Sequence, residues 1–268
     1  MSIIINADTR PERNQNKEMF NGVVDRDFLT DGIRNKIKFF EGFDKEIILF
    51  IDEHENVPRE TLDEIREIVN VLVIRKHNKR FGDMVDFAAF NDYNYLQALF
   101  MARGEYVFHF DGDVAAFTSS PEPINEMIKM LDIYDYVSYP SYWSPLPVVD
   151  NSFDHVWCST RFFACKRETL DYSEILKCML DYDYWCATYP VNRKCAWLEH
   201  WLGSISKYKG KGVFYPKIDE EKYLIFVWET YEKWTLRRLN LLPYEDVKQF
   251  VLNNGGIFYP CNLKINNT

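Results

Sequence analysis

The sequence lacks the cysteine patterns that mark zinc sites and disulfide-rich scaffolds. Its six cysteines form no CxxC pair and no Cys/His spacing of the zinc-binding kind. We therefore expect reduced thiols, as in cytosolic proteins. The residues concerned are Cys158, Cys165, Cys178, Cys186, Cys195 and Cys261.

The sequence also lacks an excess of basic residues. It contains 32 lysines and arginines against 41 aspartates and glutamates, a formal net charge of -9. Proteins that bind nucleic acid present a basic surface, so this balance argues against a nucleic-acid partner. An anionic substrate would need a neutralising cation on such a protein.

Long apolar runs are missing as well. No run approaches the roughly 20 residues needed to cross a bilayer. The first six residues, MSIIIN, lack the basic start and the long apolar segment of a signal peptide. We therefore expect a soluble protein in the cytoplasm. Peripheral membrane contact is left open, because a lipid-linked substrate requires only an interfacial surface.

What the sequence does contain is a large apolar and aromatic fraction. Hydrophobic residues make up 47% and aromatic residues 16% of the 268 positions, which is typical of a folded protein. Apolar runs alternate with helical patterns, which predicts an α/β fold with a mostly parallel central sheet flanked by helices. The predicted strands span residues 2–7, 45–52, 71–75, 106–114 and 136–139, and the predicted helices span residues 28–41, 61–69, 87–102 and 122–131.

The character of the sequence changes after the last of these strands. Residues 140–155 hold three prolines and predict a long loop, which in compact domains is commonly functional. A strand is predicted over residues 157–166, the turn into a helix over 167–170, and another helix over 196–206. Without repeats or a clear linker, the chain is interpreted as a single domain. Within this domain, the change of character separates a first part of about 120 residues from the rest of the chain.

Two carboxylates stand at the end of the fourth predicted strand. Asp111 and Asp113 are separated by Gly112. Residues two apart on a strand point to the same side, so the two carboxylates can converge on one cation, and a glycine lets a bulky ligand approach the backbone. Such oxygen ligands suit Mg2+ or Mn2+, which often bind carboxylates together with substrate phosphates. Taken alone, the triplet also fits an ordinary surface turn.

The position of the triplet favours the metal site. The second predicted strand also ends in a carboxylate, Asp52, and polar residues follow several of the strands. The carboxyl ends of the strands are where open α/β sheets bind their ligands.

Four segments within residues 1 to about 205 carry a family resemblance: SIIIN, FIDEH, ALFMARGEYVFHFDGD and LEHW. Together they resemble the GT-A glycosyltransferases, especially the glycosyltransferase family 2 superfamily, whose A-x-G-x-Y and D-x-D arrangement is the most specific match. Three departures stand out. Residues 6–9 (NADT) replace the usual proline and threonine, Asp52 is followed by Glu53 where the family has two aspartates, and Glu199 is followed by His200 where the family has Glu-Asp.

The resemblance implies a site for a nucleotide-sugar donor, with a UDP-sugar favoured. In a single GT-A domain over residues 1–268, residues 1–120 would form the nucleotide-sugar donor half, and residues 121–268 would form the acceptor half with a C-terminal extension. Residues after the first strand would border the base: Ala7, Thr9 and Arg10. Asp52 would accept a hydrogen bond from the base, and Arg75 or His77 would lie near the base or phosphates. Asp111 would contact the ribose or metal-bound water, and Asp113 would be the direct ligand of Mn2+ or Mg2+.

The predicted activity is a metal-dependent, inverting transfer of a sugar to a glycan hydroxyl. Such a transfer needs a base opposite the leaving group, and Glu199 is the candidate. Glu199 could equally be a carboxylate that only caps the helix. His200 could act as a base, serve as a third metal ligand or be a plain helix residue. Trp197 and Trp201 could either stack on a sugar or pack in the core.

Three rival functions share parts of this pattern. A haloacid-dehalogenase-type phosphatase places D-x-D after an apolar strand, but its motif usually opens the domain and is followed by Thr or Val where this chain has Ala115. A sugar nucleotidyltransferase expects a glycine-rich loop after the first strand, and residues 7–16 contain no glycine. A carbohydrate- or nucleotide-binding module without turnover fits the aromatic content.

Overall fold

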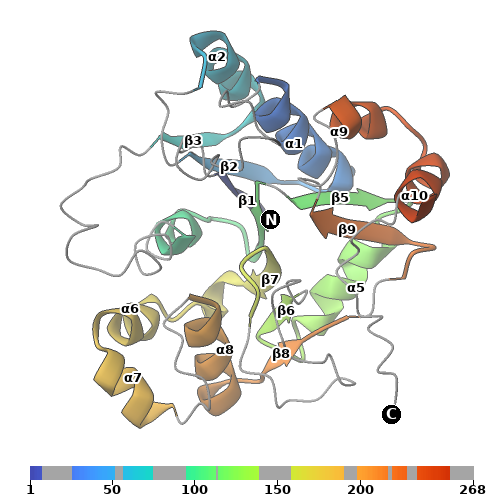
Figure 1. Ribbon diagram of the computed structural model, residues 1–268. Helices are drawn as coiled ribbons and strands as arrows, with labels where there is room; N and C mark the ends of the chain where they lie inside the picture. Colours follow the sequence, from blue (N-terminus) through green and yellow to red (C-terminus); the bar gives the residue numbers. More distant parts are fainter. Residues whose placement is uncertain are drawn as a thin grey trace.

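The computed structural model describes residues 1–7, 26–51, 57–74, 95–112, 114–138, 158–189, 198–216, 219–227 and 234–253. These residues form a seven-stranded sheet, in the order β3-β2-β1-β4-β7-β6-β8, and a separate two-stranded sheet (Figure 1). The order places β1 and β4 side by side in the middle of the larger sheet.

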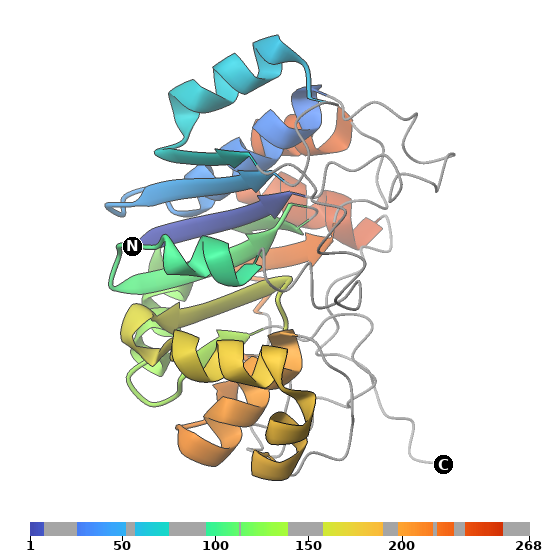
Figure 2. The ribbon, with the colours of Figure 1, turned by 90° about the vertical axis from the view of Figure 1, so that its left-hand side faces the viewer.

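Four parallel strands form the N-terminal part of the sheet. They are β1 (Ser2–Ala7), β2 (Glu46–Ile51), β3 (Val71–Ile74) and β4 (Tyr106–Asp111), and all their pairings are parallel. Their β-branched and aromatic side chains alternate between two buried layers, as expected for a sheet covered on both faces. Figure 2 shows the arrowheads of β1 and β2 pointing to the same side of the molecule. The structure thus confirms that these four segments, which the sequence predicted as the first four strands, are strands.

The second part of the sheet is mixed. β7 (Phe162–Lys166) runs antiparallel to both β4 and β6 (Tyr136–Ser138), and β8 (Val213–Phe214) runs parallel to β6. The prediction of a mostly parallel α/β sheet is therefore confirmed, with β7 as the strand that reverses direction. The predicted strand over residues 157–166 was too long, because residues 158–161 precede β7.

Helices cover both faces of the sheet. α1 (Arg26–Phe39), α2 (Arg59–Ile68) and α5 (Glu122–Met130) pack on the face where Phe108 and Phe110 point. The helical residues 95–100, α6 (Tyr172–Leu180), α7 (Tyr182–Thr188) and α8 (Leu198–Lys209) pack on the other face. β4 thus carries alternate side chains into two separate cores.

The prediction of one strand through Val114 is wrong. β4 ends at Asp111, and β5 (Val114–Thr118) belongs to the smaller sheet, where it pairs antiparallel with β9 (Tyr223–Val227). Both segments are apolar, so their hydrophobic pattern hides the turn between them. Asp111 is the last residue of β4, and Asp113 lies outside the described residues.

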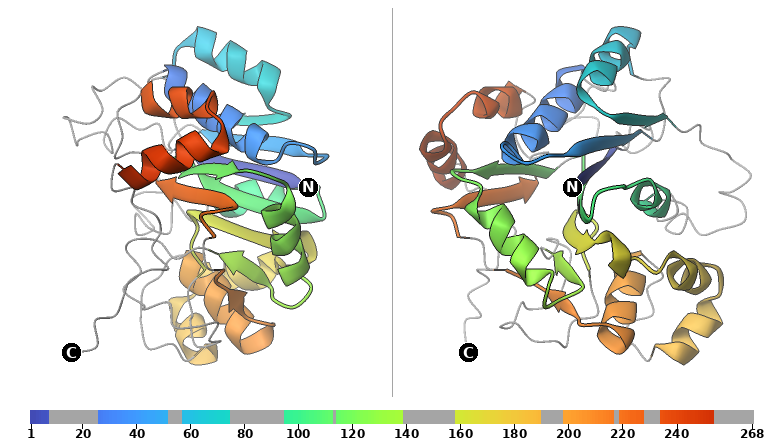
Figure 3. Two further views of the ribbon diagram at one scale, coloured as in Figure 1. Left: turned by 90° about the vertical axis from the view of Figure 1, so that its right-hand side faces the viewer. Right: turned by 180° about the vertical axis from the view of Figure 1, so that it is seen from behind.

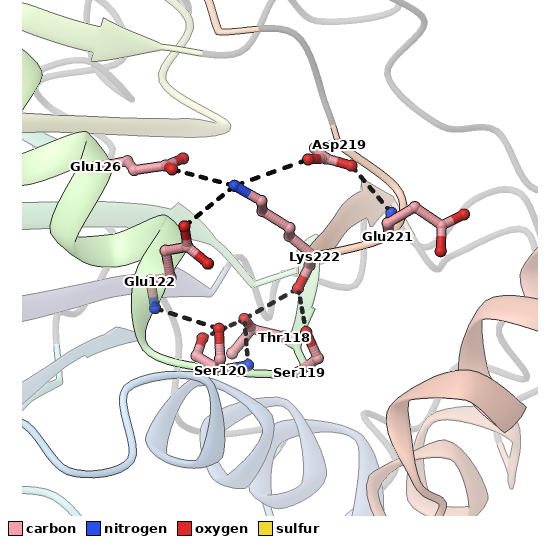
Figure 4. Close-up of polar contacts among 8 residues, drawn as sticks. All are labelled: Thr118, Ser119, Ser120, Glu122, Glu126, Asp219, Glu221 and Lys222. Atoms are coloured by element: carbon pink, nitrogen blue, oxygen red, sulfur yellow. Dashed lines mark hydrogen bonds and ion pairs between the residues drawn. The ribbon is translucent and has the colours of Figure 1, made fainter.

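The C-terminal segment completes the smaller sheet. α9 (Trp234–Asn240) and α10 (Tyr244–Asn253) lie against β5 and β9 and build a third apolar cluster with them (Figure 3). Lys222, just before β9, adds polar contacts to α5 (Figure 4). Its Nζ lies 3.3 Å from a Glu122 oxygen and 3.2 Å from a Glu126 oxygen, and its carbonyl accepts a hydrogen bond from the Ser119 amide. The ion pairs are exposed and contribute little, so the strand pairing and the cluster hold this segment.

Four described cysteines are free thiols: Cys158, Cys165, Cys178 and Cys186. In the described ranges, every helix is too short or too polar to cross a membrane.

Candidate functional site

Asp111 ends β4 beside Asn6, its partner in the β1 register. The Asp111 side chain is half-buried, and its Oδ1 accepts a hydrogen bond of 2.7 Å from the hydroxyl of Tyr95. The Asp111 amide donates to the carbonyl of Arg161 at 2.9 Å. The carboxylate is thus oriented by a helix residue and its backbone is fixed by the segment that precedes β7.

Gly112 lies in close contact with the end of β1. Its amide donates to the Asn6 carbonyl at 2.7 Å, and a Cβ added to Gly112 would lie 3.2 Å from both the Asn6 carbonyl oxygen and Ala7 Cα. Those contacts are tighter than ordinary packing. The expected reason for this glycine was room for a ligand, and the structure provides a second one in the neighbouring strand.

A buried polar pair lies behind Asp111. Asn6 Nδ2 donates to His109 Nε2 at 2.6 Å, which requires a neutral ring that accepts at this nitrogen. Complete burial lowers the pKa of His109 to about 3, although an interaction with the Thr160 backbone opposes the shift. Asn6 Oδ1 is buried and has no hydrogen-bond partner. Such an atom is costly unless something pairs with it.

Glu199 lies in the first turn of α8, where a helix dipole favours a carboxylate. Its Oε1 accepts a hydrogen bond of 2.8 Å from the Thr160 hydroxyl, and its carbonyl accepts from the Cys158 amide at 3.0 Å. Burial raises the pKa of Glu199, while the hydrogen bonds with Thr160 and the charge of Arg161 oppose the rise. The first turn of this helix is therefore anchored to residues 158–161.

The segment 158–161 joins the two predicted parts of the site. Thr160 holds the Glu199 carboxylate, and the next residue, Arg161, accepts the hydrogen bond from the Asp111 amide. The candidate base and the first aspartate of the D-x-D motif are thus tied to consecutive residues, although they are 88 positions apart in the sequence.

The residues that follow Glu199 point into the core. His200 is buried, and its ring lies 6.5 Å from that of Trp185. Trp201 is also buried, with its ring 6.5 Å from that of Trp185. Of the two readings of Trp201, core packing is the one that this burial supports.

Several predicted site residues lie outside the described residues: Thr9, Arg10, Asp52, Arg75, His77, Asp113 and Trp197. Ala7 is described, and it is buried at the carboxyl end of β1. The roles predicted for all these residues, Ala7 included, stay predictions. Sequence reasoning did not select Tyr95, His109 or Thr160 as site residues. His109 had a signal, because it lies two residues before Asp111 in an otherwise apolar strand.

The described donors near Asp111 fit a hard divalent cation. The Asp111 carboxylate and the unpartnered Oδ1 of Asn6 are oxygen donors of the type that Mg2+ and Mn2+ prefer. Within the described ranges, no three His, Cys, Asp or Glu side chains gather closely enough to hold a metal. A complete site would therefore need Asp113 or groups from the substrate.

The sequence matches no protein-family model and no curated protein. Among solved structures, it is similar to a Bacillus anthracis protein assigned as a glucose-1-phosphate thymidylyltransferase, with a TM-score of 0.53 and 11% identity over 91% of this chain and 96% of that chain. A cytidylyltransferase from Leptospira borgpetersenii gives a TM-score of 0.49 at 13% identity, covering 96% of each chain. The galactosyltransferase LgtC, with donor and acceptor sugar analogues, gives 0.48 at 10% identity over 81% of this chain and 73% of that chain.

At these identities the similarity concerns the fold. The thymidylyltransferase match and the sheet order agree with the α/β architecture that the resemblance implied. The chain therefore has the Rossmann-like fold that GT-A glycosyltransferases share with sugar nucleotidyltransferases.

Proposed function

We propose that the protein is a metal-dependent glycosyltransferase that moves a sugar from a nucleoside-diphosphate donor, with UDP favoured, to a glycan hydroxyl. The observation that carries the proposal is the pair of contacts made by Thr160 and Arg161. They tie the backbone of Asp111, at the end of a parallel strand, and the carboxylate of Glu199, on α8, to two consecutive residues. An inverting transfer of this kind uses one acidic group to bind the donor and another as the base that deprotonates the acceptor.

The donor half would bind the nucleotide and its diphosphate. Asp111, oriented by Tyr95, is proposed to contact the ribose or metal-bound water. Asp113 is proposed to bind the cation directly, and Asp52 to accept a hydrogen bond from the base. A bound Mn2+ or Mg2+ would stabilise the negative charge that develops on the leaving diphosphate. Arg75 and His77 are proposed to border the base or phosphates, and Ala7, Thr9 and Arg10 to border the base.

Glu199 would remove the proton from the acceptor hydroxyl. Burial raises the pKa of its carboxyl, which makes the carboxylate a stronger base than an exposed glutamate. The hydrogen bond from the Thr160 hydroxyl orients this carboxylate. Inversion follows if Glu199 acts from the face opposite to the diphosphate. The glycan acceptor and a cytoplasmic location are part of the proposal.

Release of the nucleoside diphosphate from nucleotide-sugars tests the proposal. Purified protein would be incubated with UDP-, GDP- and dTDP-sugars, with glycan acceptors, and with or without Mn2+. We expect Mn2+-dependent release with at least one donor, and its loss in Asp111→Asn and Glu199→Gln. Release that is unchanged in both variants would overturn the assignment of these residues.

A sugar nucleotidyltransferase is the second candidate, because the thymidylyltransferase structure has the higher TM-score among those compared above. Against it stands the absence of glycine from residues 7–16, where such enzymes place a glycine-rich loop. Pyrophosphate release from a nucleoside triphosphate and a sugar 1-phosphate would identify this activity. Nucleotide binding without either product would instead identify a binding module.

A further inference from the structure

Asn6 is the neighbour of Asp111 across the middle of the sheet. The two residues are partners in the register of β1 and β4, near the carboxyl ends of both strands. Side chains of paired residues on adjacent strands project to the same face. The contacts agree, because Tyr95 donates to Asp111 and its ring also lies 5.1 Å from that of His109, which Asn6 contacts. Asn6 and Asp111 therefore lie side by side on one face.

His109 determines which way the Asn6 amide is turned. Its Nε2 accepts a 2.6 Å hydrogen bond from Asn6 Nδ2. A ring nitrogen that accepts carries no proton, so the ring is neutral and holds its proton on Nδ1. The ring is completely buried and stacked on Phe163, with centroids 5.1 Å apart and an angle of 14° between the planes. The amide NH2 is therefore committed to a fixed acceptor, and the amide oxygen is directed away from His109.

That oxygen is left without a hydrogen bond. Asn6 Oδ1 is buried and finds no hydrogen-bond partner among the described residues. A buried acceptor without a partner lowers stability, and native proteins normally pair such atoms with protein groups, water or a ligand. The other end of the same amide is well paired, so the unpaired oxygen results from a specific orientation of the side chain. Amide oxygens are common ligands of hard divalent cations.

We propose that Asn6 Oδ1 is a direct ligand of the cation bound at the end of β4, and that His109 is the positioning residue that keeps this oxygen turned toward the ion. If the amide were rotated by 180°, its NH2 group would repel the cation. A neutral ligand also adds an oxygen without placing a second negative charge beside the Asp111 carboxylate. The inference rests on the proposed function, in which this strand end binds Mn2+ or Mg2+.

The first test removes the proposed ligand. Asn6→Leu keeps a similar volume, and Asn6→Ala avoids added bulk beside His109. Mn2+ binding is measured by electron paramagnetic resonance of free Mn2+, with the metal alone and again with UDP. We expect both variants to bind Mn2+ at least tenfold more weakly than the wild type. Asn70→Leu is the matched control, because Asn70 Oδ1 accepts from the Ile47 amide at 2.6 Å at the opposite edge of the sheet, and its Mn2+ affinity should be unchanged.

The second test addresses the positioning role of His109. His109→Leu removes the acceptor for the Asn6 amide, whereas His109→Gln retains one. We expect His109→Leu to bind Mn2+ about tenfold more weakly than the wild type and His109→Gln to restore most of the affinity. A role in packing alone would lower the melting temperature of both variants without separating their Mn2+ affinities, and that result would overturn the positioning role.

The failure of the inference and the failure of the proposed function give different results. If the wild type binds Mn2+ and both Asn6 variants bind it equally well, Asn6 is no ligand and its oxygen pairs with a buried water instead. The cation site then survives and only the inference fails. If the wild type binds no Mn2+ either alone or with UDP, the proposed metal dependence fails, and the inference fails with it.

Discussion

The hydroxyl of Tyr95 donates a 2.7 Å hydrogen bond to Oδ1 of Asp111, joining the helical segment 95–100 to the end of β4. The Tyr95 ring also lies 5.1 Å from the ring of His109, two residues earlier on the same strand. These contacts restrict the rotamers of the Asp111 carboxylate. A carboxylate held in one orientation binds a cation or a ribose at a lower entropic cost than a free one.

Tyr95→Phe should weaken Mn2+ binding by about tenfold, since it removes the orienting hydroxyl and keeps the ring. Isothermal titration with Mn2+ measures this effect. Tyr172→Phe is the matched control, because the Tyr172 hydroxyl donates to the Leu99 carbonyl at 2.7 Å and has no contact with Asp111. Equal Mn2+ affinities in the two variants would show that the Tyr95 hydroxyl does not orient the carboxylate.

Glu199→Gln should reduce turnover by about 100-fold or more, the usual effect of removing a general base, and should leave nucleotide affinity unchanged. In the wild type, activity should fall as pH drops through the raised pKa of Glu199, because the base becomes protonated. A steady-state pH profile measures both effects. Turnover that is independent of pH over this range, or a fully active Glu199→Gln, would remove Glu199 from the mechanism.

The same residue has a consequence for stability. Burial raises the pKa of Glu199 above its unfolded value, so the folded state binds a proton more tightly than the unfolded state. The carboxylate therefore costs stability at neutral pH, and the cost disappears as pH falls through the folded pKa. Glu199→Gln should unfold at an equal or higher denaturant concentration than the wild type at pH 7. A clear loss of stability would indicate a purely structural carboxylate.

His109 should make the fold sensitive to acid. Its pKa falls from 6.5 to about 3 on burial, so below pH 6.5 the unfolded state binds the proton and the folded state does not. The resulting loss of stability is about 3 kcal/mol between pH 6.5 and pH 4. His109→Gln keeps an acceptor for Asn6 without this titration. Urea unfolding of both proteins at pH 7 and pH 4 should show a smaller pH dependence for the variant, and equal dependences would contradict the assignment.

Gly112→Ala should destabilise the fold by about 1–3 kcal/mol, because the new Cβ would press on the β1 backbone. Gly32→Ala is a matched control. Its Cβ meets the Gly112 oxygen at 3.7 Å, an ordinary contact, and alanine favours the helix, so we expect no loss of stability. Chemical denaturation compares the two. A Gly112→Ala variant as stable as the wild type would show that β1 yields at this point.

Periodicity predicted the parallel strands and their helices because each segment has one clear hydrophobic period. It failed between Phe110 and Val114, where two strands of different sheets follow each other with only a short turn between them. The partner of β5 is β9, more than 100 residues later, and a local pattern carries no information about such pairing. The antiparallel direction of β7 was not predicted for the same reason.

The candidate site was predicted in part. Asp111 and Glu199 were selected from motifs, and the structure ties them to neighbouring residues, Thr160 and Arg161. Their supporting groups come from other elements and leave no motif. Tyr95 looks like one more aromatic residue of an amphipathic helix until the fold shows its hydrogen bond to Asp111.

The central claim is a cation-dependent site for a nucleoside diphosphate at Asp111. Thermal unfolding with UDP, GDP, CMP and dTDP, each with and without Mn2+, tests it most directly in the wild type and in Asp111→Asn. We predict that at least one nucleoside diphosphate stabilises the wild type only when Mn2+ is present, by about 3 kcal/mol at 100 times its Kd, and that Asp111→Asn abolishes this effect. No stabilisation of the wild type by any of these nucleotides, with or without Mn2+, would contradict the account.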